Sequence, residues 1–173
     1  MGKGILLLVA ATVLMGCAGT NVNTEGSSNI RADQSTGGES TQDFSDVIRS
    51  NWKLTTAYIN GEDIQYRRSE TPAMQEFFII SFNAQMISGT SAPNRISAPY
   101  TLGEGQLINI TMPMRSTLMA TFLEPENLNE YQFNSYLQNI FEWKLLNDNL
   151  ELFSRTEGQE IRLVFERGAS TEN

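Results

Sequence analysis

Short strand-like segments separated by turn residues fill the chain from residue 51 to residue 166, and this spacing constrains the fold more than any other feature. The first segment, 51–59, alternates in polarity, and its expected buried face carries Trp52, Leu54, Thr56 and Tyr58. Asn60-Gly61 follows it and is a strong hairpin signal. Further strands are predicted at 76–83, 85–91, 99–102, 106–110, 143–147, 150–155 and 160–166, with turns at 103–105, Asp148-Asn149 and Glu157-Gly158. Such short strands predict an antiparallel meander that curves into a partly barrel-like sheet.

Residues 124–141 have a different periodicity, which predicts one amphipathic helix. The apolar stripe at helical spacing consists of Phe133, Leu137, Ile140 and Phe141. Pro125 fits the first turn, and the carboxylates of Glu124, Glu126 and Glu130 suit the positive end of the helix dipole. A single amphipathic helix must bury its stripe against the sheet. The fold class is therefore α+β, with a curved antiparallel sheet packed against one helix.

The first seventeen residues have the pattern of an export signal. Lys3 precedes an uninterrupted apolar run at 5–15, which is too short to span a bilayer as a helix, since that takes roughly 20 residues. The ending Leu14-Met15-Gly16-Cys17 resembles the bacterial lipobox, although a residue smaller than Met15 is more usual there. That resemblance implies removal of residues 1–16 and a lipid anchor on Cys17.

The remaining segments follow from composition. Residues 17–43 are rich in small polar side chains without any hydrophobic period, so we expect a flexible tether that starts at the acylated cysteine. The folded domain is expected over 44–168 and a short tail over 169–173. An anchored domain of this kind belongs in the cell envelope. Ala18, where an Asp often marks retention at the inner membrane, favours the outer membrane with the domain facing the periplasm.

Charge and composition exclude several classes of function. The net charge is −8 and no basic cluster occurs, so a nucleic-acid partner is not expected. The chain has no histidine and one cysteine, which removes histidine-dependent catalysis, imidazole metal sites and an internal disulfide. We expect no cofactor and no metal.

Several short motifs resemble the META/HslJ family in order, over about residues 51–166. Asn94-Arg95 follow a glycine-containing stretch, Thr117, Met119 and Ala120 fit a Thr-x-Met-Ala motif, and the predicted helix carries Glu130, Phe133 and Leu137. Pro93 and Thr121 occupy the positions of two family cysteines. The resemblance implies a curved sheet packed on one helix, in a family with many envelope lipoproteins. It implies no catalytic activity.

Besides Cys17, four residues are candidates for a binding site or a structural loop: Asn94, Arg95, Thr117 and Met119. Asn94 and Arg95 suit a ligand carboxylate, but an asparagine also bonds to its own loop, and we favour that interpretation. Ser91 lies in a sequence close to a nucleophile elbow, which fails because Pro93 replaces the last glycine and no histidine exists to activate it.

Methionines at 112, 114 and 119 suit either a soft metal or the filling of gaps between helix and sheet. We favour gap filling. Trp52 is expected to anchor the core, and Glu62-Asp63 to be solvated.

These observations predict a non-enzymatic, lipid-anchored envelope protein. We expect its partner to be the membrane, through Cys17, together with an envelope protein that it binds or supports, in a role that includes the stress response. The alternative is a carrier that holds a small apolar ligand or lipid between sheet and helix. A filled core with an exposed patch favours the binding module, and a large dry cavity favours the carrier.

Overall fold

The computed structural model describes residues 43–66, 71–120, 123 and 125–168. The expected signal segment, residues 17–42 of the expected tether, Thr121 and the tail lie outside the described residues. The helical elements are α1 (Ser45–Ile48), the 3₁₀ turn η1 (Pro72–Met74) and α2 (Glu130–Gln138). The strands are β1 (Asn51–Ile59), β2 (Glu62–Asp63), β3 (Ile79–Phe82), β4 (Met86–Ser91), β5 (Asn94–Leu102), β6 (Ile108–Ile110), β7 (Arg115–Ser116), β8 (Ile140–Leu146), β9 (Asn149–Thr156) and β10 (Gln159–Arg167).

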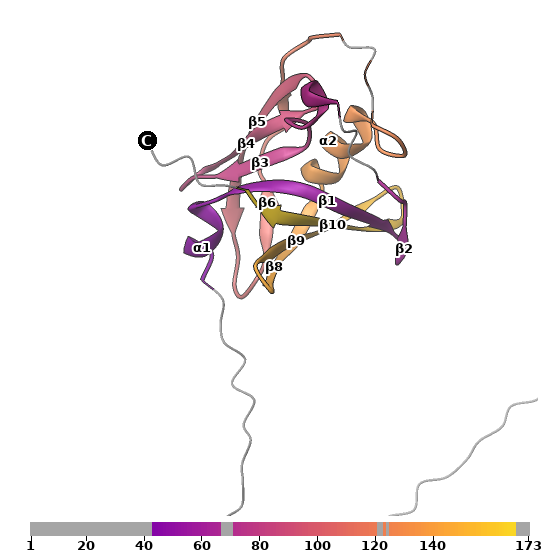
Figure 1. The fold of residues 1–173 in the computed structure, drawn as a ribbon. Helices are drawn as coiled ribbons and strands as arrows, with labels where there is room; N and C mark the ends of the chain where they lie inside the picture. Colours follow the sequence, from indigo (N-terminus) through magenta and orange to yellow (C-terminus); the bar gives the residue numbers. More distant parts are fainter. Residues whose placement is uncertain (1–42, 67–70, 121–122, 124, 169–173) are drawn as a thin grey trace, which may run out of the picture. The chain divides into compact units, whose positions relative to one another are not determined.

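The strands form one antiparallel sheet in the order β6-β5-β4-β3-β1-β10-β9-β8 (Figure 1). Strand β2 pairs with β1, and β7 pairs with β5. The outer strands β6 and β8 approach each other, since Leu107 and Glu142 form a bridge and the Trp143 N–H donates to the Gln106 carbonyl at 2.9 Å. The sheet therefore curves into a nearly closed barrel. The predicted fold class, a curved antiparallel sheet with a packed helix, is confirmed.

Tight turns make the hairpins, as their residue types predict. Asn60 and Gly61 have φ of 52° and 84°, and Glu157 and Gly158 have φ of 54° and 79°, which is the left-handed backbone that two-residue hairpin turns require. The turn between β8 and β9 falls one residue earlier than predicted. Asn147 and Asp148 take the positive φ values, and Asn149 already belongs to β9.

Strand β1 has the predicted bounds but not the predicted face. Trp52 and Leu54 are buried, whereas Ala57 is buried in place of Thr56 and Tyr58. The register against β10 shifts between Leu54 and Thr56. This bulge adds one residue, and one extra residue moves every later side chain to the opposite face.

The helix α2 is half as long as predicted. It begins after Asn129, whose side chain accepts from the Gln132 N–H in a capping box, so Pro125 and Glu126 precede it. It ends at Gln138. Ile140 and Phe141, which the sequence placed on the helical stripe, instead start strand β8.

Two strands also differ from their predicted ranges. The segment at 76–83 is a strand only over Ile79–Phe82, because Phe78 adopts a positive φ of 54° and turns its ring into the core. Strand β5 begins at Asn94, five residues before the predicted range, so Asn94 and Arg95 belong to a strand rather than a loop.

Aromatic side chains fill the space between α2 and the sheet. The Phe133 ring lies 4.5 Å from that of Phe78 and 6.4 Å from that of Phe165, centroid to centroid, and Leu137 is fully buried. Trp52 is fully buried, as predicted, and its Nε1–H donates to the Val47 carbonyl, which ties α1 to β1. The apolar stripe of α2 is therefore covered by side chains of the sheet.

The predicted exposure of Glu62, Asp63 and the three methionines can be compared with the structure. Glu62 and Asp63 are exposed, as expected. The gap-filling role is wrong for Met112 and Met119, which are exposed, and holds for Met114, which packs against the core. None of the helices in the described part of the chain is long and apolar enough to cross a membrane.

Candidate binding site between β7 and α2

The structure brings three of the four predicted site residues together. Asn94 is the first residue of β5, while Thr117 and Met119 lie in the segment that follows β7. Arg95 takes part through its backbone, and its side chain is exposed. Cys17 lies outside the described residues.

The side chain of Asn94 holds the segment after β7 in place. Its Oδ1 accepts from the Thr117 hydroxyl at 2.9 Å and from the Met119 N–H at 2.7 Å. Its Nδ2 donates to the Met119 carbonyl at 3.1 Å and to Glu130 at 2.8 Å. An asparagine amide has two donor hydrogens and an oxygen with two lone pairs, so these four bonds use all of its capacity. With 5% of its surface exposed, Asn94 has nothing left to offer a ligand carboxylate.

Thr117 extends the same network toward β5. Its hydroxyl accepts from the Arg95 N–H at 3.0 Å while it donates to Asn94, and its own N–H donates to the Arg95 carbonyl at 3.1 Å. Two neighbouring residues of β5 therefore fix this threonine through both its backbone and its side chain.

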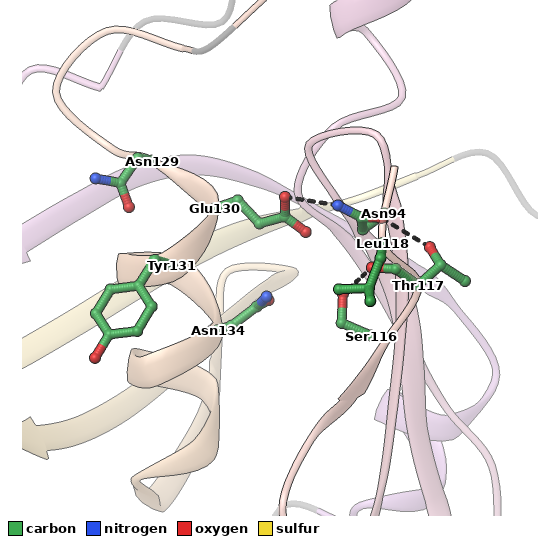
Figure 2. A pocket seen from close by; sticks show the side chains of 8 residues that line it. All are labelled: Asn94, Ser116, Thr117, Leu118, Asn129, Glu130, Tyr131 and Asn134. Atoms are coloured by element: carbon green, nitrogen blue, oxygen red, sulfur yellow. Dashed lines mark hydrogen bonds between the residues drawn. The ribbon is translucent and has the colours of Figure 1, made fainter. Parts of the chain in front are cut away.

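Glu130 joins this network to the helix. Ser91 and Asn94 face each other as a strand pair at the tip of the β4–β5 hairpin. The Glu130 carboxylate accepts from the Ser91 hydroxyl with one oxygen at 2.8 Å. Its other oxygen accepts from the Asn94 amide, also at 2.8 Å (Figure 2). A carboxylate in the first turn of a helix is also favoured by the helix dipole. The hairpin tip and the start of α2 are thus locked together.

The sequence pointed to Glu130 only as part of a helix motif and not as a member of the site. The sequence signal that could have identified it is the joint presence of Asn94, the Thr-x-Met-Ala motif and this glutamate in one chain. Each motif is local, and nothing in the residues between them shows that they meet.

We call residues 112–119, which include β7, the β7 segment. A pocket of about 450 Å³ opens beside the Asn94 network, between the β7 segment and α2 (Figure 2). On one side Leu118 is 99% exposed, and on the other Tyr131 is 79% exposed. The pocket is lined by Asn94, Ser116, Thr117, Leu118, Asn129, Glu130, Tyr131 and Asn134.

Three side chains on α2 face the β7 segment at intervals of one helical turn: Glu130, Asn134 and Gln138. Glu130 bonds to Asn94 at one end. At the other end the Gln138 amide accepts from the Met114 N–H at 2.6 Å and donates to the Met112 carbonyl at 3.3 Å. Between them the buried Oδ1 of Asn134 has no hydrogen-bond partner among the described residues. The pocket lies at this middle position.

Two kinds of reactive group can be examined at the site, the Ser91 hydroxyl and clusters of metal-binding side chains. Ser91 is fully buried and its hydroxyl donates to Glu130, so it does not face a substrate. No cluster of three carboxylate or thiol side chains suited to a metal occurs in the part of the chain that the structure describes. What the site offers is polar groups at the base of a pocket with apolar side chains on its rim.

Comparison with known proteins decides the family. The family model described as the META domain matches residues 45–168, which is most of the chain. The chain belongs to the META family. Within this META domain, the polar motif residues form the Asn94 network, while Phe133 and Leu137 of the helix motif lie in the core. Whether positions 93 and 121 are close enough for a cysteine pair stays a prediction, because Thr121 is outside the described residues.

Two solved structures share the META fold of this chain. An NMR structure of a protein from Burkholderia xenovorans aligns with a TM-score of 0.52 and 16% identity, covering 72% of this chain and 86% of that one. A crystal structure of a DUF4847 family protein from Bacteroides vulgatus aligns with a TM-score of 0.51 and 15% identity, covering 71% and 95%. A search of curated proteins finds no match.

Proposed function

We propose that this META-domain protein is a lipid-anchored, non-enzymatic binding module of the cell envelope, which recognises a protein partner at the pocket between β7 and α2. The observation that supports the proposal is a rigid polar network that holds two exposed apolar side chains, Leu118 and Tyr131, at the rim of an open pocket.

The rim has the features of a recognition surface. Large apolar side chains that are exposed together mark interaction sites, since burying them against a partner is favourable. The Asn94 side chain bonds to both neighbours of Leu118, to the hydroxyl of Thr117 and to the backbone N–H of Met119. A surface that is already ordered loses less entropy when it binds.

The carrier alternative has less support. A lipid carrier needs space between the sheet and α2, and there the rings of Phe78, Phe133 and Phe165 are in contact. The pocket beside α2 opens at the surface and is lined largely by polar residues.

The anchor rests on the sequence around Cys17, which resembles a lipobox after a short apolar run. Acylation there would hold the domain at the membrane, in our proposal the outer membrane facing the periplasm. Replacing the cysteine by serine, Cys17→Ser, should abolish incorporation of a clickable fatty acid in bacterial cells. Equal labelling of both proteins would rule out the anchor.

In-cell photocrosslinking tests the binding surface. The full chain carries a photoreactive amino acid at position 118 or 131, with position 104 or 148 as exposed controls in the β5–β6 and β8–β9 turns. We expect a discrete adduct from positions 118 and 131 and none from the controls. Absence of an adduct at both rim positions, or the same adduct from all four positions, would refute the proposal.

A further inference from the structure

Among the described residues, strand β7 uses one of its two edges for backbone pairing. It pairs with β5 through Arg115 and Ser116, and the next residue, Thr117, donates its N–H to the Arg95 carbonyl. The Met114 N–H points the other way, to Gln138 of α2. In an antiparallel ladder successive residues direct their peptide groups to opposite sides. The peptide groups of Ser116 and Leu118 therefore face α2, on the side of the pocket.

A helix cannot pair with this edge through its backbone. The peptide groups in the body of α2 are bonded within the helix, so only side chains can cross the gap. Gln138 does so at Met112 and Met114, and Glu130 does so at Asn94. Between these two crossings, no described residue bonds to the outward peptide groups of Ser116 and Leu118, and the Asn134 Oδ1 has no partner among the described residues. The open stretch is a strand edge with hydrogen-bonding capacity.

We propose that an extended peptide segment of the partner adds to β7 as a further strand, bonding its main chain to Ser116 and Leu118 and placing an apolar side chain between Leu118 and Tyr131. This rests on the proposed function and names the form of its ligand. Strand addition of this type takes affinity from main-chain bonds and specificity from pockets for alternate side chains. Asn134, which lines the pocket, lies on the α2 side of the added strand.

Geometry limits the length and character of the segment. Glu130 and Gln138 are eight residues apart on α2, which is about 12 Å along the axis, and an extended chain covers that distance in about four residues. The Glu130 carboxylate and the net charge of −8 disfavour acidic side chains in the ligand. The segment is therefore a short, uncharged or basic strand with apolar residues at alternate positions.

The test uses a protein variant that changes only the open edge. Ser116→Pro removes the outward N–H at position 116, and a proline is tolerated on a strand edge when its nitrogen faces away from the ladder. Ser116→Ala is the matched control, since it removes the hydroxyl and keeps the N–H. The probe is a mixture of blocked pentapeptides with threonine at the odd positions and valine, isoleucine or tyrosine at the even positions. Binding to the full acylated chain in detergent micelles is followed by NMR at the amide of residue 118, which all the variants retain.

If the peptide adds as a strand, two results are expected. Ser116→Pro should weaken binding about tenfold relative to Ser116→Ala, which is the effect of one lost hydrogen bond. N-methylation of one alternate set of peptide nitrogens should also weaken binding about tenfold, while methylation of the other set should have little effect. The second test does not depend on the folding of any variant.

The outcomes separate this inference from the proposed function. Equal binding of the two methylated sets, together with equal binding by the two Ser116 variants, would overturn strand addition. Failure of every peptide to bind, while position 118 still crosslinks to a partner in cells, would overturn it too and leave the proposed function standing. Loss of the crosslinks themselves would overturn both.

Discussion

The two edges of the sheet meet along one seam, and the two halves of that seam are closed in different ways. Where β6 meets β8, backbone groups close it, with the Leu107–Glu142 bridge and the bond from Trp143 to Gln106. Where β7 faces α2, side chains cross it at Glu130 and Gln138 and leave a pocket between them. Because the helix α2, and not a strand, stands opposite β7, no backbone groups of the described barrel wall face the outer edge of β7. The N–H and C=O groups on that edge can therefore bond to a partner.

The packing beneath α2 should dominate the stability of the open half. Phe133→Ala removes a fully buried ring that contacts Phe78 and Phe165, and we expect a loss of about 3–5 kcal/mol in the free energy of unfolding. Urea denaturation of the full chain measures it. Tyr131→Ala, on the exposed face of the same helix, is the control and should change stability by less than about 0.5 kcal/mol. Similar losses for both would mean that the helix is not anchored as described.

The polar network should come next in size. Asn94→Ala leaves the Met119 peptide group and the Glu130 carboxylate without their partner, which should cost about 2–3 kcal/mol. Arg95→Ala removes a neighbouring exposed side chain and serves as the control. Denaturation midpoints would reveal the difference. Equal midpoints for the two variants would show that the network does not hold the segment after β7.

Tyr66 offers a comparison in alkaline solution. Its ring packs on Phe78 below α2, its hydroxyl has no partner among the described residues, and burial raises its pKa to about 12. The unfolded chain ionises near pH 10, so stability is retained below pH 10 and falls as the pH rises from 10 toward 12, by up to about 2 kcal/mol. Tyr66→Phe should be at least as stable at pH 7 and should lack this component of the alkaline loss. The same pH dependence in wild type and variant would contradict the assignment.

The smallest effects are expected at two positions of α2 that face residues 112–118. Gln138→Ala removes two bonds to the backbone at Met112 and Met114 and should cost about 1 kcal/mol. Asn134→Ala, one turn earlier, removes an amide oxygen without a partner and should cost close to nothing. Thermal melts of the two variants side by side give the difference. An equal or larger loss at Asn134 would indicate that the pocket is closed in solution.

Most strands and turns were predictable because their signals are local. Alternation marked β1, and Asn60-Gly61 and Glu157-Gly158 marked their hairpins. The bulge at Thr55 was not predictable, since an extra residue in one strand appears only when its partner strand is known. It moved Ala57 inward.

The predicted C-terminal end of α2 was wrong for a different reason. Ile140 and Phe141 continue the helical stripe in sequence, and they also suit a strand, because periodicity alone cannot assign a short apolar run. Tertiary pairing with β9 decides in favour of the strand.

The sequence predicted some residues of the site but not its pocket. The sequence named Asn94, Thr117 and Met119, but the pocket depends on contacts between residues far apart in the chain. Glu130 reaches Asn94 across 36 residues, and Gln138 reaches Met114 across 24. The two-residue strand β7 has no hydrophobic alternation of its own, so nothing marked it as an edge.

Asn94 makes to Met119 the pair of bonds that a neighbouring strand residue would make, one from the N–H and one to the carbonyl. Gln138 does the same between Met114 and Met112. When these two side chains rotate, the stretch from Met112 to Met119 is held only by its short pairing with β5 at Arg115, Ser116 and Thr117. We expect its amides to exchange with deuterium before those of β1 and β10, because its opening breaks a two-residue ladder and not the body of the sheet.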